Sequence, residues 1–387
     1  MKKERCMEGK IGCTQKEITE LTGRIARERI APTAGDRDTK GAFPREAVEL
    51  LGASGILGMI LAAEHNGVGA NRAAFAAMTA ELSGACASTA LVTVSHMVVE
   101  KAIESAATVA VADKWLARLA TGRALGAFAV HEAGSGSNAG AIATKACRDG
   151  TNYIVNGSKF FITSAGEADV YLVLVRTDPE KGPQGMSVLL IEKDTPGLSF
   201  GLPEDKMGLR GTCSREMFFD NCRVPLENLV GAEGSGLQVI GQNLVGWGFF
   251  GAAGISAGIA RQATRLAVDH ARERKIAGLP IGAHQAVQTL LADMILQTEA
   301  AESLIASCAG RADGAPATAA INGIKAKLFA SERAVEVADR AIQVMGGHGY
   351  CRDYTVERLF RDARGLTLHF KTSELLRQDL AKWALDA

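Results

Sequence analysis

Three glycine-containing stretches hold residues whose types and spacing suit ligand binding. The first, residues 129–140, reads AVHEAGSGSNAG. Its small residues let the backbone approach a ligand closely and leave N–H groups free to bond a polar ring edge or a phosphate. A flexible loop that leaves a strand has the same composition. This stretch alone therefore leaves both interpretations open.

The other two stretches lie in the C-terminal half. Residues 274–285 (RKIAGLPIGAHQ) follow a helical segment with a basic last turn, as a helix C-terminus favours. They are either a capped helix end with a solvated basic face or a place where Arg274 and Gln285 fix a pyrophosphate. Residues 343–350 (QVMGGHGY) contain glycines that could simply end a helix. In either case they bring backbone close to a neighbour.

The elements that must position these stretches change character twice along the chain. Residues 16–122 carry apolar side chains at helical spacing. From about 123 the chain becomes short β-rich runs divided by Gly, Asp, Asn and Pro, and residues 237–387 return to helical periodicity. We therefore expect an α+β protein with an N-terminal all-helical domain (1–122), a central antiparallel β-barrel or sandwich (123–232) and a C-terminal four-helix bundle (233–387).

Composition limits the classes of partner. The chain has 387 residues with 47% apolar content, enough for several cores. Lys+Arg and Asp+Glu both number 43, so no net field favours nucleic acid or an anionic membrane. We expect small molecules and copies of the chain itself as partners.

Location and cysteine chemistry follow from what the chain lacks. The eight cysteines are scattered without a Cys-x-x-Cys pair, which predicts reduced, mostly buried thiols and no metal site. The first residues are charged but precede no apolar run of signal-peptide length, and no later stretch approaches the apolar span that a bilayer needs. We expect a soluble, cytoplasmic protein without membrane insertion.

In this order, within a helix–barrel–helix chain, the three stretches resemble those of the acyl-CoA dehydrogenase family. The resemblance covers essentially the whole chain. Further matching segments are FIT at 161–163, KMGLRG at 206–211, VPLEN at 224–228, VERLFRDA at 356–363 and TSE at 372–374.

The resemblance implies an FAD cofactor and assigns residues to its parts. The edge of the isoalloxazine would contact Phe128, Val130, His131 and Ser137, while Phe161 and Thr163 would cover its other side. The pyrophosphate and adenosine half would be held, partly across a subunit interface, by Arg274, Gln285, Gln343, Gly346 and Gly347. Thr372 and Glu374 would close over the cofactor. A pyrophosphate needs a fixed cation and backbone donors, which agrees with this assignment.

The base that family members use is missing from its usual place. They remove an α-proton with a Glu that precedes a Gly just ahead of the Thr-x-Glu element, and here that pair is Phe370-Lys371. The family's other base position falls on Trp247. The substitutes that we consider are His369, next to the lost base, and His96 or Thr93 on the helix that lines the family's acyl pocket.

The flavin edge also departs from the family pattern, because His131 stands where a Thr is usual. A cationic imidazole there would favour anionic reduced flavin, whereas a neutral histidine would only pack behind the ring. The sequence leaves both open.

The function that the resemblance implies is an FAD-dependent oxidoreductase acting on the CH–CH group of an acyl thioester, with a relocated or substituted base and an unusual (alicyclic or already unsaturated) acyl-CoA. An enoyl-thioester reductase, a flavin monooxygenase and a non-catalytic FAD-binding subunit are the alternatives. The expected partners are acyl-CoA or an acyl-carrier thioester, an electron-transfer flavoprotein and further copies of the chain in a homotetramer.

Overall fold

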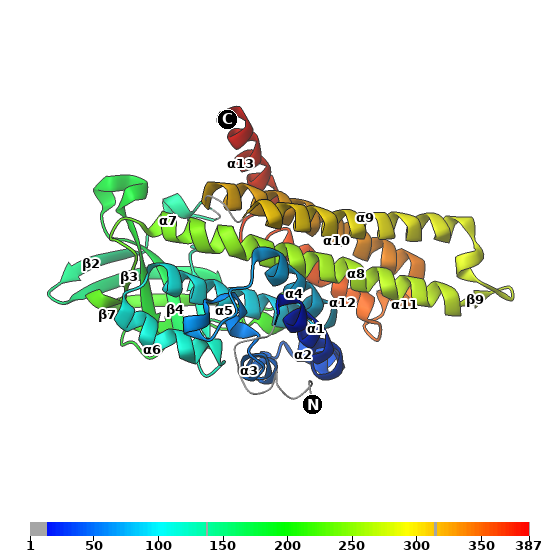
Figure 1. The fold of residues 1–387 in the computed structure, drawn as a ribbon, viewed down its shortest axis with the longest axis horizontal. Coiled ribbons are helices and arrows are strands. Elements are labelled where there is room, and N and C mark those ends of the chain that lie inside the picture. Colours follow the sequence, from blue (N-terminus) through cyan, green and yellow to red (C-terminus); the bar gives the residue numbers. More distant parts are fainter. Residues whose placement is uncertain (1–13, 137, 313–315, 387) are drawn as a thin grey trace.

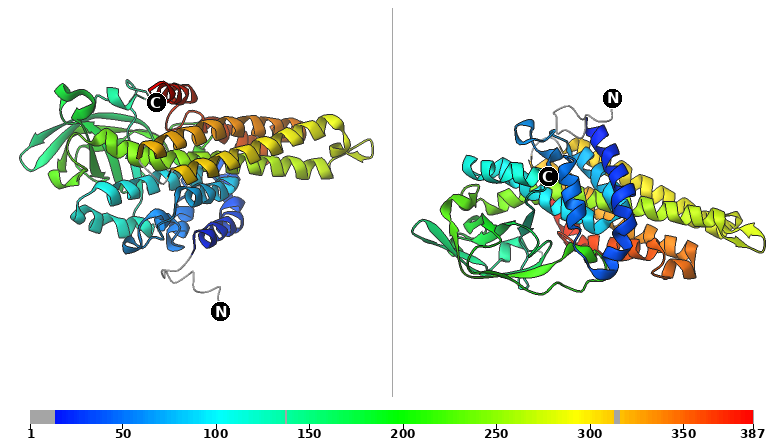
Figure 2. Two further views of the ribbon diagram at one scale, coloured as in Figure 1. Left: turned by 45° about the horizontal axis from the view of Figure 1, so that its top comes forward. Right: turned by 90° about the horizontal axis from the view of Figure 1, so that it is seen from below.

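The computed structural model describes residues 14–136, 138–312 and 316–386. Helices come first, a β-sheet follows, and helices end the chain (Figure 1). The predicted order of a helical unit, a β-unit and a second helical unit is confirmed. Figure 2 shows the N-terminal helices lying along one side of the long C-terminal helices, with the sheet at one end.

The N-terminal unit contains helices that start at polar caps. Thr14 and Glu17 form a reciprocal capping box at the first helix, and Asn71 and Thr108 cap two later ones. Its α-helices are α1 Gln15–Ile25, α2 Ala31–Lys40, α3 Arg45–Ala53, α4 Arg72–Ala85, α5 Ala87–Ala106 and α6 Val109–Ala120, with a π-helical turn, η2 Ala26–Ile30, between the first two.

The central unit is one mixed sheet with the strand order β6-β7-β3-β2-β4-β5-β8, and β1 pairs with β4. The strands are β1 Gly126–Ala129, β2 Lys145–Asp149, β3 Asn152–Ile162, β4 Val170–Arg176, β5 Met186–Glu192, β6 Leu198–Phe200, β7 Arg215–Pro225 and β8 Leu229–Val230. The expectation of a wholly antiparallel unit was wrong, because β1 runs parallel to β4. Parallel strands need a long connection, because the chain must return to the end of the sheet at which the first strand began. The segment between β1 and β4 is long enough for this, whereas a tight hairpin joins only antiparallel strands.

The C-terminal unit is built around one long central helix (Figure 1). Its elements are α7 Gly236–Ile240, the π-helix η9 Gly241–Gly248, α8 Phe249–Glu273, the short strands β9 Lys275–Ile276 and β10 Leu279–Pro280, α9 Gln285–Arg311, α10 Pro316–Met345, α11 Gly347–Tyr350, α12 Thr355–Leu366 and α13 Ser373–Asp386.

Close contact between α4 and α8 joins the two helical units. A methyl group on Gly254 would come within 2.2 Å of the Ala76 carbonyl oxygen, and one on Gly258 within 2.1 Å of the Ala80 carbonyl oxygen. Only glycine fits at these positions without moving a helix. Every residue of α8 from Phe249 to Ala260 is buried.

Two observations bear on the environment of the chain. The expectation that no stretch approaches the apolar span of a bilayer was wrong by length and composition. Among the described residues, the helical run Gly236–Glu273 is long and apolar enough to cross a membrane, but 94% of its most apolar window is buried inside the protein, as in a core helix. Of the six described cysteines, four are buried, while Cys147 and Cys351 are exposed.

Candidate active site

A cavity of about 680 Å³ lies where the sheet meets the loop after α12. Six residues singled out in the sequence line it together: Phe128, His131, Phe161, Thr163, His369 and Phe370. They come from the end of β1, the end of β3 and the segment that follows α12. The fold therefore brings together residues that are up to about 240 positions apart.

Phe161 is the most exposed aromatic residue of this lining. Its side chain is 53% exposed, and its φ of 55° lies in the left-handed region, which a bulky residue rarely adopts. Such strain persists where the surroundings impose it, often next to a ligand. A flat ring placed in the cavity would cover this exposed apolar face.

A buried ion pair shapes the loop after β1. Lys159 donates to Glu132 over 2.8 Å and to the Val130 carbonyl over 3.2 Å. Glu132 also accepts from the backbone N–H groups of Ala143 and Thr144. Burial raises the pKa of Glu132, but Lys159 and these donors together bring it below its usual value, while burial lowers the pKa of Lys159 to about 8. The pair thus ties both ends of the glycine-rich loop to β3.

Phe370 stands at the wall of the cavity where a base was expected. It is 6% exposed, and its ring stacks on Phe128 at 5.7 Å and lies 6.2 Å from Phe249. Its φ is 61°, another left-handed value for a bulky residue. The position holds apolar packing where an ionisable group was expected.

Polar contacts from three side chains hold the segment that carries Phe370. The buried Lys327 of α10 donates to the Lys371 carbonyl over 2.7 Å and to the Thr367 carbonyl over 3.4 Å. Lys371 in turn binds Asp379 of α13 at 2.5 Å. Burial lowers the pKa of Lys327 to about 7. Lys327 was not found from the sequence, although a lysine inside the apolar run of a helix is a signal for a buried donor.

His131 is the third of these side chains, with its Nε2 3.1 Å from the Phe370 carbonyl oxygen. A carbonyl only accepts, so Nε2 carries the hydrogen. Burial lowers the pKa of His131, Lys159 lowers it further, and the bond to Phe370 opposes both. This supports the neutral histidine and argues against the cationic one. His131 therefore joins the loop after β1 to the segment around Phe370.

His369 is the sequence candidate that the fold places in the cavity. Its ring meets the Phe370 ring edge-on at 4.4 Å, and its Nε2 is shielded from water without a hydrogen-bond partner in the described part of the chain. Burial, followed by electrostatic repulsion between the protonated imidazole and His131, Lys327 and Lys206 in their charged forms, lowers the pKa of His369 to about 3. The imidazole is therefore neutral near pH 7, and in that state one of its two ring nitrogens carries a lone pair.

His96 and Trp247 occupy quite different places. His96 is fully buried on α5, accepts from the Gly126 N–H over 3.0 Å and lies 3.2 Å from Glu100. It connects α5 to β1 and does not line the cavity. Trp247, in η9, is 7% exposed, and the Arg72 guanidinium covers its ring at 4.5 Å. Neither side chain is presented to a ligand in this structure.

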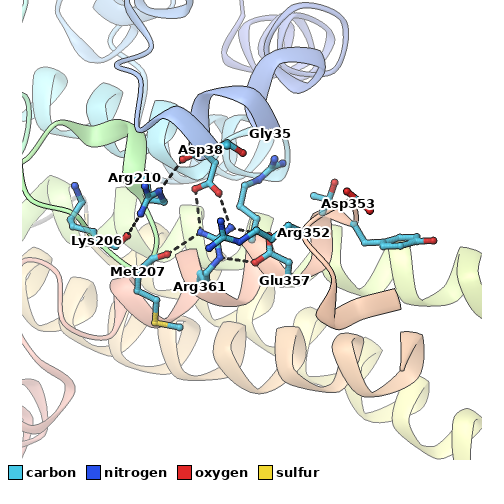
Figure 3. A pocket seen from close by; sticks show the side chains of 13 residues that line it. Gly35, Asp38, Lys206, Met207, Arg210, Arg352, Asp353, Glu357 and Arg361 are labelled. Carbon is cyan, nitrogen blue, oxygen red and sulfur yellow. Dashed lines mark hydrogen bonds and ion pairs between the residues drawn. The ribbon is translucent and has the colours of Figure 1, made fainter. Parts of the chain in front are cut away.

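A charged network holds the loop along one side of the cavity (Figure 3). Arg361 of α12 binds both carboxylate oxygens of Asp38, at 3.2 and 2.7 Å, and donates to the Met207 carbonyl over 2.9 Å. It also forms a two-fold contact with Glu357. Arg210 donates to the Asp38 carbonyl over 3.0 Å. Bidentate pairs add geometric specificity as well as energy. These pairs therefore hold α2, α12 and residues 206–210 in fixed positions relative to one another.

Two residues next to this network had no role assigned from the sequence, although one of them, Lys206, begins the matching segment 206–211. Glu204 and Lys206 line the cavity, and the Lys206 Nζ is shielded from water without a hydrogen-bond partner among the described residues. Burial lowers the pKa of Lys206. Glu204 is half-buried, whereas the neighbouring Asp205 is paired with Arg210 at 2.6 Å.

A second cavity, of about 570 Å³, lies at the other end of α8. Arg274, Gly346 and Gly347 line it with His270 and His348. The remaining predicted cofactor residues lie elsewhere. Gln285 and Gln343 are exposed near the second cavity without lining it, Val130 is buried behind the first, and Thr372 and Glu374 lie at the start of α13, outside either lining. Ser137 lies outside the described residues.

The two cavities are far apart within one chain. The Phe249 ring contacts Phe370 at one end of α8, and His270 lies at the other end of this 25-residue helix. At 1.5 Å per residue, α8 separates them by roughly 30 Å. A dinucleotide whose ring and pyrophosphate are joined by a short ribityl chain does not span that distance.

Comparison with known proteins identifies the architecture. The acyl-CoA dehydrogenase N-terminal, middle and C-terminal domain models match residues 13–123, 127–222 and 234–385. The chain belongs to the acyl-CoA dehydrogenase family. It is thus an FAD-dependent oxidoreductase of the acyl-CoA dehydrogenase type.

Its relatives act on varied acyl groups, as their names state. The chain is 37% identical to the cyclohex-1-ene-1-carbonyl-CoA dehydrogenase of Syntrophus aciditrophicus, covering 94% of this chain and 88% of that one. It is 36% identical to the acryloyl-CoA reductase (NADH) of Anaerotignum propionicum, covering 99% and 98%. The solved structure of butyryl-CoA dehydrogenase from Megasphaera elsdenii superposes with a TM-score of 0.92 at 32% identity, covering 97% and 100%.

The residues of the first cavity fit the flavin ring. It offers an exposed aromatic face in Phe161, a hydroxyl in Thr163 and a backbone loop shaped by the Glu132–Lys159 pair. In the part of the chain that the structure describes, the buried Lys206 Nζ and His369 Nε2 have no hydrogen-bond partner, whereas buried polar groups normally have one. Among the described residues, no cluster of three His, Cys, Asp or Glu side chains is placed to hold a metal ion.

Proposed function

We propose that this enzyme oxidises the CH–CH group of an acyl-CoA thioester with His369 in place of the family's carboxylate base. The proposal is supported by Phe370, which we place at the position of that carboxylate and whose ring packs on Phe128 and Phe249 beside His369, the Nε2 of which has no hydrogen-bond partner among the described residues. A phenyl ring accepts no proton, so another group must carry it.

Each side chain then has a distinct task. His369 Nε2 accepts a proton as its C–H bond breaks: the α-proton of a saturated acyl group, or the γ-proton of a cyclohex-1-ene-1-carbonyl group, whose α-carbon carries no hydrogen. The flavin, when bound, would accept the hydride, from the β-carbon in the first case and from the allylic ring carbon on the other side of the α-carbon in the second, where the existing double bond shifts and two conjugated double bonds result. Phe370 and Phe128 keep water from the reacting carbons, while His131 and Lys327 hold the segment 367–371 in position through its carbonyl groups. The neutral state of His369 makes its lone pair available without a prior deprotonation.

The strength of this base suggests the substrate class. A pKa lowered to about 3 means that the free imidazole is a weak base, so it suits a carbon acid stronger than a saturated acyl chain. A proton next to an existing double bond is more acidic, because the resulting charge spreads over the conjugated system. We therefore propose an alicyclic or already unsaturated acyl group, in keeping with the name of the Syntrophus relative.

Anaerobic mixing of the purified yellow protein with a panel of CoA esters tests this. We expect cyclohex-1-ene-1-carbonyl-CoA to bleach the flavin band much faster than butyryl-CoA or octanoyl-CoA does. Equally fast bleaching by the straight-chain esters would overturn the proposed base and substrate class. A colourless protein that takes up no FAD would contradict the cofactor assignment itself.

A reductase is the second candidate, favoured by the similarity to acryloyl-CoA reductase. Protons could then come from solvent through the partly exposed cavity. In that case, chemically reduced enzyme should be reoxidised by acryloyl-CoA under anaerobic conditions faster than the saturated ester reduces it. The ratio of the two half-reactions separates the candidates.

We also propose that the working enzyme contains more than one chain, as a homotetramer, and passes electrons to an electron-transfer flavoprotein. The roughly 30 Å between the cavities supports this, since one chain would supply the flavin end of the site and another the pyrophosphate end. The exposed Ile276, Leu279 and Tyr350 near the second cavity suit a subunit contact. A monomer in light scattering with FAD still bound would refute it.

A further inference from the structure

The second cavity contains more basic chemistry than Arg274 alone. His270 of α8 and His348 of α11 both line it, with ring centroids 5.7 Å apart. Its other lining residues are apolar or glycine, apart from the Cys351 thiol, and no carboxylate is among them. The Asp38 network of Figure 3 differs, because its arginines are paired with acids.

The surroundings of the two imidazoles favour anion binding. His270 faces Arg274 and Glu273 from its own segment and His348 from α11, while the Tyr354 ring contacts His348 at 5.0 Å. One turn before His270, Asp269 is near Arg265 and Arg272. The charges that face the cavity itself are therefore positive or able to become positive.

We infer that His270 and His348 form, with Arg274, a proton-linked binding site for the diphosphate of the dinucleotide. The charge of His348 opposes protonation of His270. A bound diphosphate would favour their charged forms, since an opposite charge within a few ångströms stabilises a cation.

The direction of the pH dependence of FAD binding follows from the pKa of His270. Burial, then the charges of His348 and Arg274, lower its pKa in the ligand-free chain, so it is largely neutral at pH 7. Binding of the dianion would raise that pKa and take up a proton. By linkage, FAD is then held more tightly as pH falls, by up to roughly tenfold per pH unit for each proton taken up. The diphosphate diester of FAD does not itself titrate in this range.

Equilibrium dilution of the holoenzyme tests the inference. Released FAD is measured by its fluorescence between pH 5.5 and 8.5, so the readout does not depend on turnover. The variants are His270→Gln, His348→Gln and the double change. His65→Gln is the matched control, because His65 lies in the N-terminal unit, contacts Glu64 and lines neither cavity.

We expect wild type and His65→Gln to hold FAD more tightly as pH falls, and the double variant to lose that slope while retaining much of its affinity at pH 8.5. A flat wild-type profile would overturn the inference. So would a slope that persists in the double variant, because the titrating group would then lie elsewhere, for example at His131. The outcome is independent of which acyl-CoA the enzyme oxidises.

Discussion

The two ends of the proposed cofactor site are built differently. At the proposed diphosphate end, Arg274 and the glycines at 346 and 347 are exposed and keep the residue types that the resemblance to the family implies. At the proposed flavin end, His131 and Phe370 stand where the resemblance implies other residues, and they contact each other. An anion can be bound by exposed groups whose positions are not tightly constrained. Proton transfer depends on buried groups in a defined geometry, so the substitution of one of them requires its neighbours to change as well.

The largest expected effect is at the flavin end. His369→Ala should lower the rate of flavin reduction by the best CoA ester by about 10²–10⁴-fold, because it removes the proposed proton acceptor. Stopped-flow absorbance of the flavin band measures this. FAD content should be unchanged.

Glu204→Gln is the comparison variant for that experiment, since Glu204 is another cavity-lining residue able to accept a proton. We expect it to retain most of the wild-type rate. If Glu204→Gln instead lowers the rate of flavin reduction and His369→Ala leaves it unchanged, the Glu204 carboxylate is the base. The proposed flavin end would then depend on a half-buried residue, and it would differ less from the exposed diphosphate end.

At the diphosphate end, Arg274→Ala should weaken FAD binding without altering the rate of the flavin-loaded enzyme. Charge-assisted hydrogen bonds contribute about 1.5–3 kcal/mol each, or roughly 10–150-fold in Kd. Fluorescence titration of FAD measures the change. Arg272→Ala is the control, since Arg272 lies near Asp269 and does not line the cavity. An equal loss in both variants would show a general charge effect.

A gain of function would sharpen the comparison. Phe370→Glu should increase bleaching by butyryl-CoA about tenfold, because burial among Phe128 and Phe249 raises the pKa of a carboxyl and makes it a stronger base. Adding Lys371→Gly should change little, since Lys371 is already engaged by Asp379. Phe370→Gln is the matched control. A gain with Phe370→Gln would point to altered packing instead of a new base.

The smallest expected effect is that of pH on the rate of flavin reduction. A base acts in its deprotonated form, and the pKa of His369 is lowered to about 3, so flavin reduction should stay flat between pH 5 and 8. An inflection of the rate near pH 6.5 would mean that the pKa of His369 has its ordinary value. Bound ligands would then offset the lowering of this pKa by burial.

The amino-acid pattern alone settles the order of the three units and the family. The spacing of apolar residues distinguishes helical segments from strands. The family follows from several motifs that occur in the same order along the whole chain. It also predicts the loss of the base at Phe370, because that change is visible as a residue type. The parallel pairing of β1 with β4 was missed, because pairing direction depends on where the chain returns.

Only the tertiary structure separates His369 from His96. Both are histidines beside apolar residues in the sequence, but His369 lines the cavity, whereas His96 accepts a hydrogen bond from the Gly126 N–H inside the core. The same holds for His131, whose neutral state follows from burial near Lys159, and for Lys327, whose partners are 40 and 44 residues away. A side chain's protonation and role depend on its solvation and long-range neighbours, and these exist only once the chain has folded.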